Sequence, residues 1–424
     1  MFYSGHGSGG PVFLHPESHL LVLGPPRSGK TRSVVVPNIL CANGPVIATS
    51  TKNDLIDETS QARGQIGNVM VFDPSGMVSI PSHARRVYWS PINPNGSYSE
   101  ILSVTRAMID SSALTGTSQG YSHWIERAAS LLAPLMHAAQ IAGYEMDTVM
   151  GWLNLRECKD PAGILRACGE DMALNSLKGI LLSEDRERSG IFSTALGLLG
   201  SYNFPELNSQ RNLERFDSQT FLNSRDTLYI VSPSYIQKLV APVIVGLIDE
   251  VKNRSFVLSS NRDSDYARPA LSLILDEMAN VAPLGSLSSI LSEGASQKVM
   301  LLGALQDLSQ ARVRWGEASS GFVTLFGSLI VFPGIADGQT LHQLSEISGV
   351  RAFENVSDTF ASSLHYRFKI PSSRSRSYGY HNVLEPWQIA RAPFGEAYLF
   401  RKYHQVSRVM LKNVPEIKPR IREF

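Results

Sequence analysis

Cysteine is scarce in this chain of 424 residues, and its few positions exclude several kinds of site. The three cysteines, Cys41, Cys158 and Cys168, are odd in number and lie at no spacing that is typical of metal ligands. A disulfide framework and a cysteine zinc site are therefore not expected. The pattern is typical of reduced thiols in a cytosolic protein.

Long hydrophobic runs are absent as well. No stretch of the sequence approaches the roughly 18 consecutive apolar residues that indicate a transmembrane helix, and no secretory signal is recognisable at the N-terminus. We therefore expect the chain itself to be soluble.

An excess of charge of either sign is also missing. The chain carries 39 Lys and Arg residues against 38 Asp and Glu residues, a formal net charge of +1. Any basic surface for nucleic acid must therefore be local. A hydrophobic content of 43% is ample for a large core, and the length predicts two to three domains.

The most informative motif lies near the N-terminus. Residues 24–31 read Gly-Pro-Pro-Arg-Ser-Gly-Lys-Thr, which is the G-x-x-x-x-G-K-T pattern of a phosphate-binding loop. The apolar run 19–23 before it predicts a buried parallel strand, and residues 31–40 after it can form a helix. This context disfavours the alternative of a glycine-rich turn with an incidental lysine.

The loop predicts an ATP site. Backbone N–H groups at the start of a helix form a concavity for phosphate. We expect Lys30 to reach the β- and γ-phosphates of ATP, and the Thr31 hydroxyl to hold Mg²⁺. The residues expected to bind the nucleotide are Gly24, Pro25, Pro26, Arg27, Ser28, Gly29, Lys30, Thr31 and Arg32.

A second part of the site is expected at the end of another strand. The apolar run 270–275 ends in Asp276 and Glu277. In P-loop enzymes an acid at this place assists the metal, and a second one orients or deprotonates the attacking water. We assign Asp276 to Mg²⁺ and Glu277 to water, while two solvated acids at a strand end are the alternative.

Gln306 ends the next strand, and it can sense the γ-phosphate or position water. A simple turn residue is the alternative. The carboxyl ends of parallel strands line one crevice of an open sheet. We therefore expect Gly24, Thr49, Asp73, Asp276 and Gln306 to point toward one site. Lys30, Asp276, Glu277 and Gln306 are the catalytic candidates.

The order of elements predicts a discontinuous α/β domain. Short apolar strands separated by helix-sized intervals are typical of a parallel sheet. We expect this domain to span residues 12–96 and 216–405, with an all-α domain inserted at 97–215. Strands are predicted at 20–23, 45–50, 68–73, 227–231, 271–275, 299–305, 328–332 and 396–400. Helices of the insertion are predicted at 98–110, 121–142, 146–156, 161–170, 173–182 and 187–199, with a kink or break at Pro134.

Three segments are expected to be irregular. Residues 1–11 are rich in glycine and serine and predict a flexible lead-in, and the basic residues 406–424 predict a loosely ordered tail. Residues 351–380 are polar and predict a loop. Its arginines and tyrosines could serve single-stranded DNA, although a solvated loop is favoured: Arg374, Arg376, Tyr366, Tyr378 and Tyr380.

Nearly the whole chain resembles the type IV coupling proteins, the TraG/TraD-like ATPases of conjugation and type IV secretion. The P-loop alone is shared by many ATPases, so the narrower motifs carry more weight. These are Asp276-Glu277-Met278-Ala279-Asn280 and Gln306-Asp307-Leu308-Ser309-Gln310, together with Ser50-Thr51-Lys52-Asn53-Asp54, Phe72-Asp73-Pro74 and Trp124-Ile125-Glu126-Arg127.

The resemblance implies a RecA-like P-loop NTPase domain, a mostly parallel sheet with helices on both faces, that carries an all-α domain. It implies a hexameric ring on the cytoplasmic side of the inner membrane. Such a ring hydrolyses ATP with Mg²⁺ and passes single-stranded DNA or a DNA–relaxase complex to a type IV secretion channel. The family normally has an N-terminal membrane anchor, so this chain is expected to be a truncated part or a soluble relative.

One position departs from the family pattern. Relatives often carry an arginine in the segment before the Gln306 strand that acts on the neighbouring subunit's nucleotide, and here Ala295 stands at that place. Lys298, Arg312 and Arg314 are candidate replacements. Loss of such a cation can cost orders of magnitude in rate, so two alternatives stay open. One is a nucleotide-gated docking platform without processive translocation. The other, a septal FtsK-like translocase, is disfavoured by the helical insertion.

Overall fold

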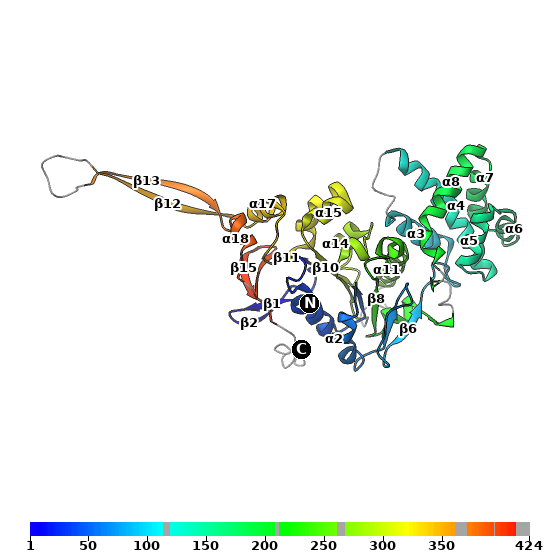
Figure 1. Cartoon of the computed structure of the whole chain (residues 1–424), viewed down its shortest axis with the longest axis horizontal. Helices are drawn as coiled ribbons and strands as arrows, with labels where there is room; N and C mark the ends of the chain where they lie inside the picture. Colours follow the sequence, from blue (N-terminus) through cyan, green and yellow to red (C-terminus); the bar gives the residue numbers. More distant parts are fainter. Residues whose placement is uncertain are drawn as a thin grey trace.

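The computed structural model describes residues 1–112, 119–204, 206–207, 212–260, 268–360, 371–393 and 395–412. Its centre is a 13-stranded sheet with helices on both faces, and further helices form one end of the elongated molecule (Figure 1). The order of the strands is β2-β1-β15-β14-β11-β3-β10-β9-β4-β8-β5-β6-β7.

Nine neighbouring strands of this sheet are parallel. Most of them are largely apolar and are buried along their whole length, as a sheet covered by helices on each side requires. In spatial order they are β11 (Ser328–Val331), β3 (Leu20–Leu23), β10 (Val299–Leu305), β9 (Leu271–Leu275), β4 (Val46–Ser50), β8 (Thr227–Val231), β5 (Val69–Phe72), β6 (Arg85–Tyr88) and β7 (Glu214–Arg215). The strands predicted for seven of these segments agree to within a residue, whereas no strand was predicted at β6 or β7.

Four antiparallel strands extend the sheet beyond β11. They are β14 (Glu396–Arg401), β15 (His404–Met410), β1 (Tyr3–Gly7) and β2 (Gly10–Phe13). The expectation of a flexible lead-in at 1–11 is therefore wrong. The expectation of a loose tail at 406–424 is wrong for residues 406–410, which belong to β15. The Asn38 side chain holds the first strand, because it accepts from the Tyr3 N–H at 2.7 Å and donates to the Tyr3 carbonyl at 2.9 Å.

Alternate residues of each strand face two hydrophobic layers. One layer packs against η1 (Thr31–Val35), α1 (Val36–Cys41) and α2 (Asp54–Arg63). The opposite layer contains the long helix α11 (Gln237–Ser260) and continues into the helical end of the molecule. Shorter helices flank these layers: α10 (Ser218–Leu222), α13 (Met278–Val281), α14 (Leu287–Glu293), α15 (Leu308–Trp315), η4 (Gly316–Gly321), α16 (Phe322–Phe326), α17 (Gly338–Ile347) and α18 (Pro386–Ala390).

The helical end is built from the segment in which helices were predicted. Its first helix begins with a capping box, in which Ser97 and Glu100 bond each other's backbone N–H groups. Pro134 lies inside a helix that continues through it without a break. The helices are α3 (Tyr98–Asp110), α4 (Gln119–Ala142), α5 (Met146–Leu155), α6 (Lys159–Ala167), α7 (Asp171–Leu181), α8 (Asp185–Leu198) and η2 (Gly200–Asn203).

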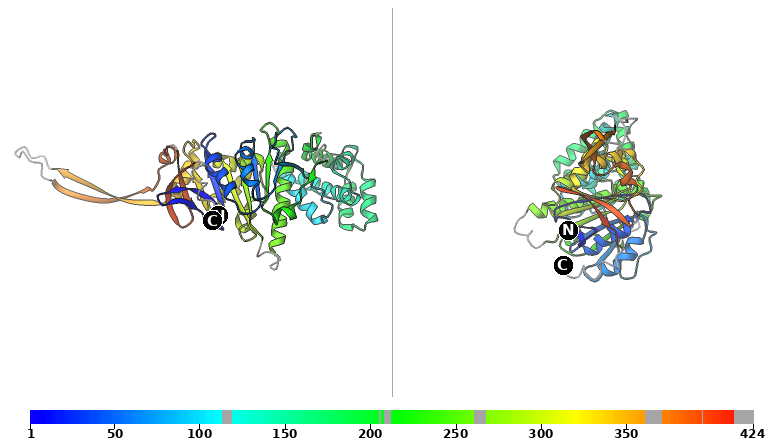
Figure 2. Two further views of the ribbon diagram at one scale, coloured as in Figure 1. Left: turned by 90° about the horizontal axis from the view of Figure 1, so that it is seen from below. Right: turned by 90° about the vertical axis from the view of Figure 1, so that its left-hand side faces the viewer.

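A two-stranded antiparallel ribbon projects from the opposite end (Figure 2). It consists of β12 (Val350–Phe360) and β13 (Pro371–Asn382), which pair in register from Val350–Asn382 outward. The expectation of an irregular loop over 351–380 is therefore wrong for the two strands. Residues 361–370, including Tyr366, lie outside the described part of the chain.

Candidate functional site

The phosphate-binding loop leaves β3 at the carboxyl edge of the sheet. The Gly24 N–H donates to the Leu305 carbonyl at 3.2 Å, which ties the start of the loop to the end of β10. Gly24 is required by its packing, because a Cβ atom there would lie 2.6 Å from the Cβ of Phe332. The loop then turns through two left-handed residues, Arg27 at φ 63° and Gly29 at φ 94°.

The helix after the loop starts with an unusual turn. Residues Thr31–Val35 form a π-helix, and the Val36 N–H donates to the Thr31 carbonyl. Pro37, in the first turn of α1, has no N–H to continue a regular ladder. A widened turn of this kind is frequent at functional sites. Here it begins at the two residues expected to contact phosphate and metal.

Lys30 folds back into the loop. Its ammonium donates to the Gly24 carbonyl and to the Pro25 carbonyl, the latter at 3.1 Å, and the residue is only 6% exposed. Burial lowers the pKa of Lys30, whereas the nearby carboxylates of Glu277 and Asp276 act in the opposite direction. The cation therefore lies inside the loop, close to both acids.

Asp276 joins the end of β9 to the phosphate-binding loop. Its carboxylate accepts from the Thr31 hydroxyl at 2.9 Å, and its carbonyl accepts from the Thr49 hydroxyl at the end of β4 at 3.0 Å. Burial raises the pKa of Asp276, while the Thr31 bond and the Lys30 charge act against this rise. A hydroxyl and one carboxylate side by side are oxygen ligands suited to Mg²⁺, which keeps several ligands from water and phosphate.

Glu277 is held in a strained conformation beside Asp276. Its φ of 53° lies in the left-handed region, which is uncommon for a residue with a side chain. The side chain forms hydrogen bonds with Gln306 and Asn280. Burial, and then the charge of Asp276, raise the pKa of Glu277. Such a rise is what a general base near neutral pH requires.

Gln306 is itself positioned by a residue that the sequence analysis assigned no role. The Gln306 N–H donates to the side-chain oxygen of Gln310 at 2.9 Å. Gln310 and Asn280 were both recognised as motif positions. Asn280 follows Glu277 by three residues, and Gln310 follows Gln306 by four. This spacing is close to one helical turn, so it places both amides back over the strand ends, and it is the signal that could have indicated their roles.

One further polar group of the phosphate-binding loop is available to an anionic ligand. The Ser28 hydroxyl is buried and has no hydrogen-bond partner among the described residues. No cluster of three or more His, Cys, Asp or Glu side chains suited to a metal occurs in the described segments. A metal at this place would therefore depend on Thr31 and Asp276 together with ligands from the nucleotide.

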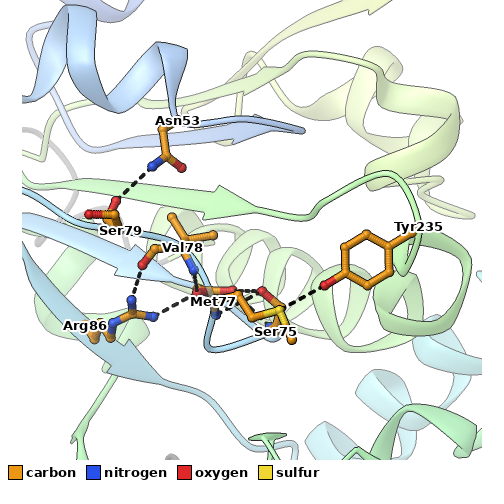
Figure 3. A network of polar contacts seen from close by, with 8 residues as sticks. Asn53, Ser75, Met77, Val78, Ser79, Arg86 and Tyr235 are labelled. Atoms are coloured by element: carbon orange, nitrogen blue, oxygen red, sulfur yellow. Dashed lines mark hydrogen bonds and ion pairs between the residues drawn. The ribbon is translucent and has the colours of Figure 1, made fainter.

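Two expected residues lie outside this constellation. Arg32 points away from the loop and forms an exposed ion pair with Glu58 at 3.1 Å. The hydrogen bonds of the Asp73 carboxylate are made next to its own loop. It accepts from the Ser75 and Val78 N–H groups and from Arg86 at 2.8 Å. Figure 3 shows this network and two further contacts of the loop, from Asn53 to the Ser79 carbonyl and from Tyr235 to the Met77 sulfur.

The three candidate replacement cations each contact groups of their own chain. Lys298 lies at the opposite, amino-terminal end of β10, and its ammonium donates to the Arg268 carbonyl at 3.0 Å. Arg312 forms an ion pair with Asp337 at 2.6 Å, which contributes to a lowered pKa of that acid. Arg314 donates to the Ser111 carbonyl, and burial lowers its pKa.

Sequence comparison finds a family match over almost the whole chain. Residues 2–406 match the model of the family described as type IV secretory system conjugative DNA transfer. The protein VirD4 of Rhizobium rhizogenes and that of Agrobacterium fabrum are each 23% identical over 369 residues, which cover 81% of this chain and 51% of the relative. The chain thus spans about half the length of these curated relatives.

Comparison with solved structures finds the fold of this chain in conjugative coupling proteins. The unbound monoclinic form of the bacterial conjugative coupling protein TrwBdeltaN70 superposes with a TM-score of 0.73 at 19% identity, covering 96% of this chain and 88% of that one. The plasmid coupling protein TrwB in complex with ADP and Mg²⁺ gives a TM-score of 0.68 at 20% identity, covering 94% and 86%. The shared architecture is a RecA-like α/β fold with a mostly parallel sheet, together with an all-α domain. No helix in the described part of the chain is long and apolar enough to span a membrane.

Proposed function

The chain belongs to the type IV secretory system conjugative DNA transfer family, and we propose that it binds and hydrolyses ATP to drive the transfer of DNA. The observation that carries this proposal is the contact between the two halves of the site. Thr31 of the loop bonds Asp276 at 2.9 Å, while Lys30 lies close to Asp276 and Glu277. A structural turn would not require a buried lysine beside one buried and one half-buried acid.

The residues suggest a division of work during hydrolysis. Lys30 would exchange its bonds to the loop carbonyls for bonds to the β- and γ-phosphates, with backbone N–H groups of residues 28–31 around them. Thr31 and Asp276 would hold Mg²⁺, which neutralises charge on the phosphates when it is bound. Glu277 would take the proton of the attacking water. Gln306, bonded to Glu277, would report whether the γ-phosphate is present.

We propose the wider setting from family membership. The cargo would be single-stranded DNA, alone or with a relaxase, and the destination would be the components of a type IV secretion channel. A homohexameric ring would act on the cytoplasmic side of the inner membrane, held there by an anchor. We further propose that the all-α domain lies within the expected range 97–215, except for Glu214 and Arg215, which form strand β7 of the sheet, and that it is at the end of the molecule remote from the ribbon.

Two variants test the chemistry of the site. Glu277→Gln should still bind ATP, since the amide preserves shape, but its hydrolysis should fall about a hundredfold or more because the base is lost. Lys30→Ala should lose ATP binding itself. Arg32→Ala is a matched control, because this cation adjoins Lys30 in the chain but points toward Glu58, and it should bind and hydrolyse ATP normally. Normal hydrolysis by Glu277→Gln would contradict the assignment.

A second candidate is a docking platform whose nucleotide state gates handover of a substrate without processive movement. It is favoured by Ala295 and by the contacts that engage Lys298, Arg312 and Arg314 within their own chain. The two candidates differ in what Glu277→Gln does. A platform would capture and release its substrate on ATP binding alone, whereas a motor would stall in this variant.

A further inference from the structure

Helix α15 begins directly after the strand end that carries Gln306. The Gln306 side chain is hydrogen-bonded to Glu277, and its backbone N–H donates to the side-chain oxygen of Gln310 in α15 at 2.9 Å. The helix has eight residues and is therefore about 12 Å long. A shift of Gln306 thus acts directly on the first turn of this helix.

Helix α15 is held along its length by α17. The Leu308 N–H donates to the Thr340 hydroxyl at 3.1 Å, and Arg312 forms an ion pair with Asp337 at 2.6 Å. A short helix attached at both of its turns moves as one body, because neither end can fray independently. Its far end therefore follows its first turn.

The far end of α15 contacts the last turn of α3. The Arg314 guanidinium donates to the carbonyl of Ser111, which is the residue that ends α3 and is 2% exposed. The Ser111 N–H in turn donates to the Ala107 carbonyl of the same turn at 3.2 Å. Helix α3 is the first helix of the proposed all-α domain. One hydrogen bond thus joins α15 to this domain.

The segment that follows Glu277 reaches the same place. It passes through the short helix α13 to Leu284, whose carbonyl accepts from the Trp315 indole N–H at 2.8 Å. The next residue, Gly285, lies against α3, since a Cβ atom there would be 3.3 Å from the Cβ of Asp110. The segments leaving both catalytic strand ends therefore meet at the carboxyl-terminal end of α3.

The middle of α3 is held by other bonds. The Asn253 amide of α11 donates to the Ser103 hydroxyl at 3.0 Å and to Asp249 at 2.8 Å, and Asp249 also accepts from the Ser286 hydroxyl at 3.0 Å. None of these bonds involves α15. Removal of the Arg314 contact should therefore leave α3 in its place and free only its last turn from α15.

The chemistry of the Arg314 contact suits a bond that is broken and remade. Arg314 is half-buried, and burial lowers its pKa. No acid in the described ranges forms an ion pair with it. Its charge faces the carboxyl-terminal end of a helix, whose partial negative charge attracts cations. This attraction is weaker than that of a buried carboxylate, and packing alone would not require a charge here.

We propose that Arg314 couples the nucleotide state at Gln306 to the all-α domain. When ATP replaces ADP, Gln306 would turn from Glu277 to the γ-phosphate, α15 would shift, and Arg314 would transmit the shift to the last turn of α3. By linkage, a substrate bound to that domain would in turn change the affinity for ATP. Arg314 is a positioning residue, because it acts through Gln306. This inference deepens the proposed function and rests on it.

The first test is amide hydrogen exchange of the whole chain with ADP or with a non-hydrolysable ATP analogue. Exchange at residues 107–111 should differ about tenfold between the two states, within the usual range of such couplings. The difference should vanish in Arg314→Met and persist in part in Arg314→Lys, whose ammonium can still donate to the carbonyl. Arg106→Met is the control, since this arginine of α3 pairs with Glu126 at 3.2 Å and should keep the original difference.

Steady-state hydrolysis gives a second readout. Arg314→Met should lower kcat about tenfold and leave KM for ATP unchanged, because Gln306 loses its position while the phosphate-binding loop is untouched. Arg314→Lys should recover part of the loss. A general loss of structure would instead change KM and the circular dichroism spectrum as well. A raised KM with unchanged kcat would contradict the inference.

The outcomes separate this inference from the proposed function. If Arg314→Met keeps the nucleotide-dependent exchange of α3, the inference is overturned. If the original chain hydrolyses ATP but shows no such difference, the coupling fails and the ATPase proposal stands. If the difference depends on Arg314 but DNA leaves hydrolysis unchanged, the coupling stands and the motor proposal fails. A chain that binds neither nucleotide would overturn both.

Discussion

Arg63 is the largest fully buried side chain of the molecule's described part, and its replacement gives a sharp test of how the carboxyl-terminal end of α2 is held. Its guanidinium donates to the Thr227 hydroxyl at 2.7 Å and to the carbonyls of Ala42, Gly44 and Arg225. It therefore joins α2 to the segments that enter β4 and β8, two strands near the centre of the sheet.

The expected cost of Arg63→Met follows from two opposing contributions. Four acceptors lose their donor, and at about 1–1.5 kcal/mol for each buried group this loss amounts to about 4–6 kcal/mol. In return, no charge has to be buried. Burial lowers the pKa of Arg63 from 12.5 to about 10, a penalty of about 3 kcal/mol that the neutral methionine avoids. The net loss should be about 1–3 kcal/mol.

Urea unfolding followed by circular dichroism measures this difference. Arg63→Lys should be no more stable than Arg63→Met, because it keeps the buried charge but has only three donors, in a geometry unlike the planar fork. A gain in stability on Arg63→Met would refute the reasoning, because it would mean that the four hydrogen bonds are worth less than the burial penalty. A lysine variant as stable as the original would refute it too.

Two further predictions concern the site and its support. Gly24→Ala should weaken ATP binding about tenfold, measured with a fluorescent ATP analogue, since overpacking against Phe332 costs about 1–3 kcal/mol; unchanged affinity would show that the loop has room. Burial lowers the pKa of His19 from 6.5 to about 4, so the unfolded chain takes up a proton before the folded one. The stabilisation of the folded state that depends on a neutral His19 is fully present above pH 6.5. The free energy of unfolding should therefore decline by about 3 kcal/mol as the pH falls to about 4. Urea unfolding across this range should show a smaller decline for His19→Gln, and equal declines would contradict the assignment.

The parallel sheet was accessible from the sequence because its strands carry strong local signals. Runs such as Leu20–Leu23 and Val69–Phe72 are apolar at every position and are bounded by turn residues. The neighbourhood of Lys30, Thr31 and Asp276 followed from one rule of topology, that parallel strands end on a common edge. No tertiary information was needed to bring these three residues together.

Other features depend on partners that lie far away in the sequence. The strand at Tyr3–Gly7 is polar and glycine-rich, and it is defined by its pairing with β15 and by Asn38. The ribbon lacks the alternation of apolar and polar residues that indicates a strand with one buried face. Asp73 follows its strand as a site residue would, yet the nearby Arg86 and loop N–H groups engage it. Strand position alone could not reveal that competition.

The central claim is that the site around Lys30, Asp276 and Glu277 couples ATP hydrolysis to DNA. The most direct measurement is the steady-state rate of ATP hydrolysis by the assembled protein, with and without single-stranded DNA, using Glu277→Gln as the inactive reference. The account predicts that DNA raises the rate and that the reference stays inactive with or without DNA. Equal rates with and without single- or double-stranded DNA in the assembled protein would contradict it.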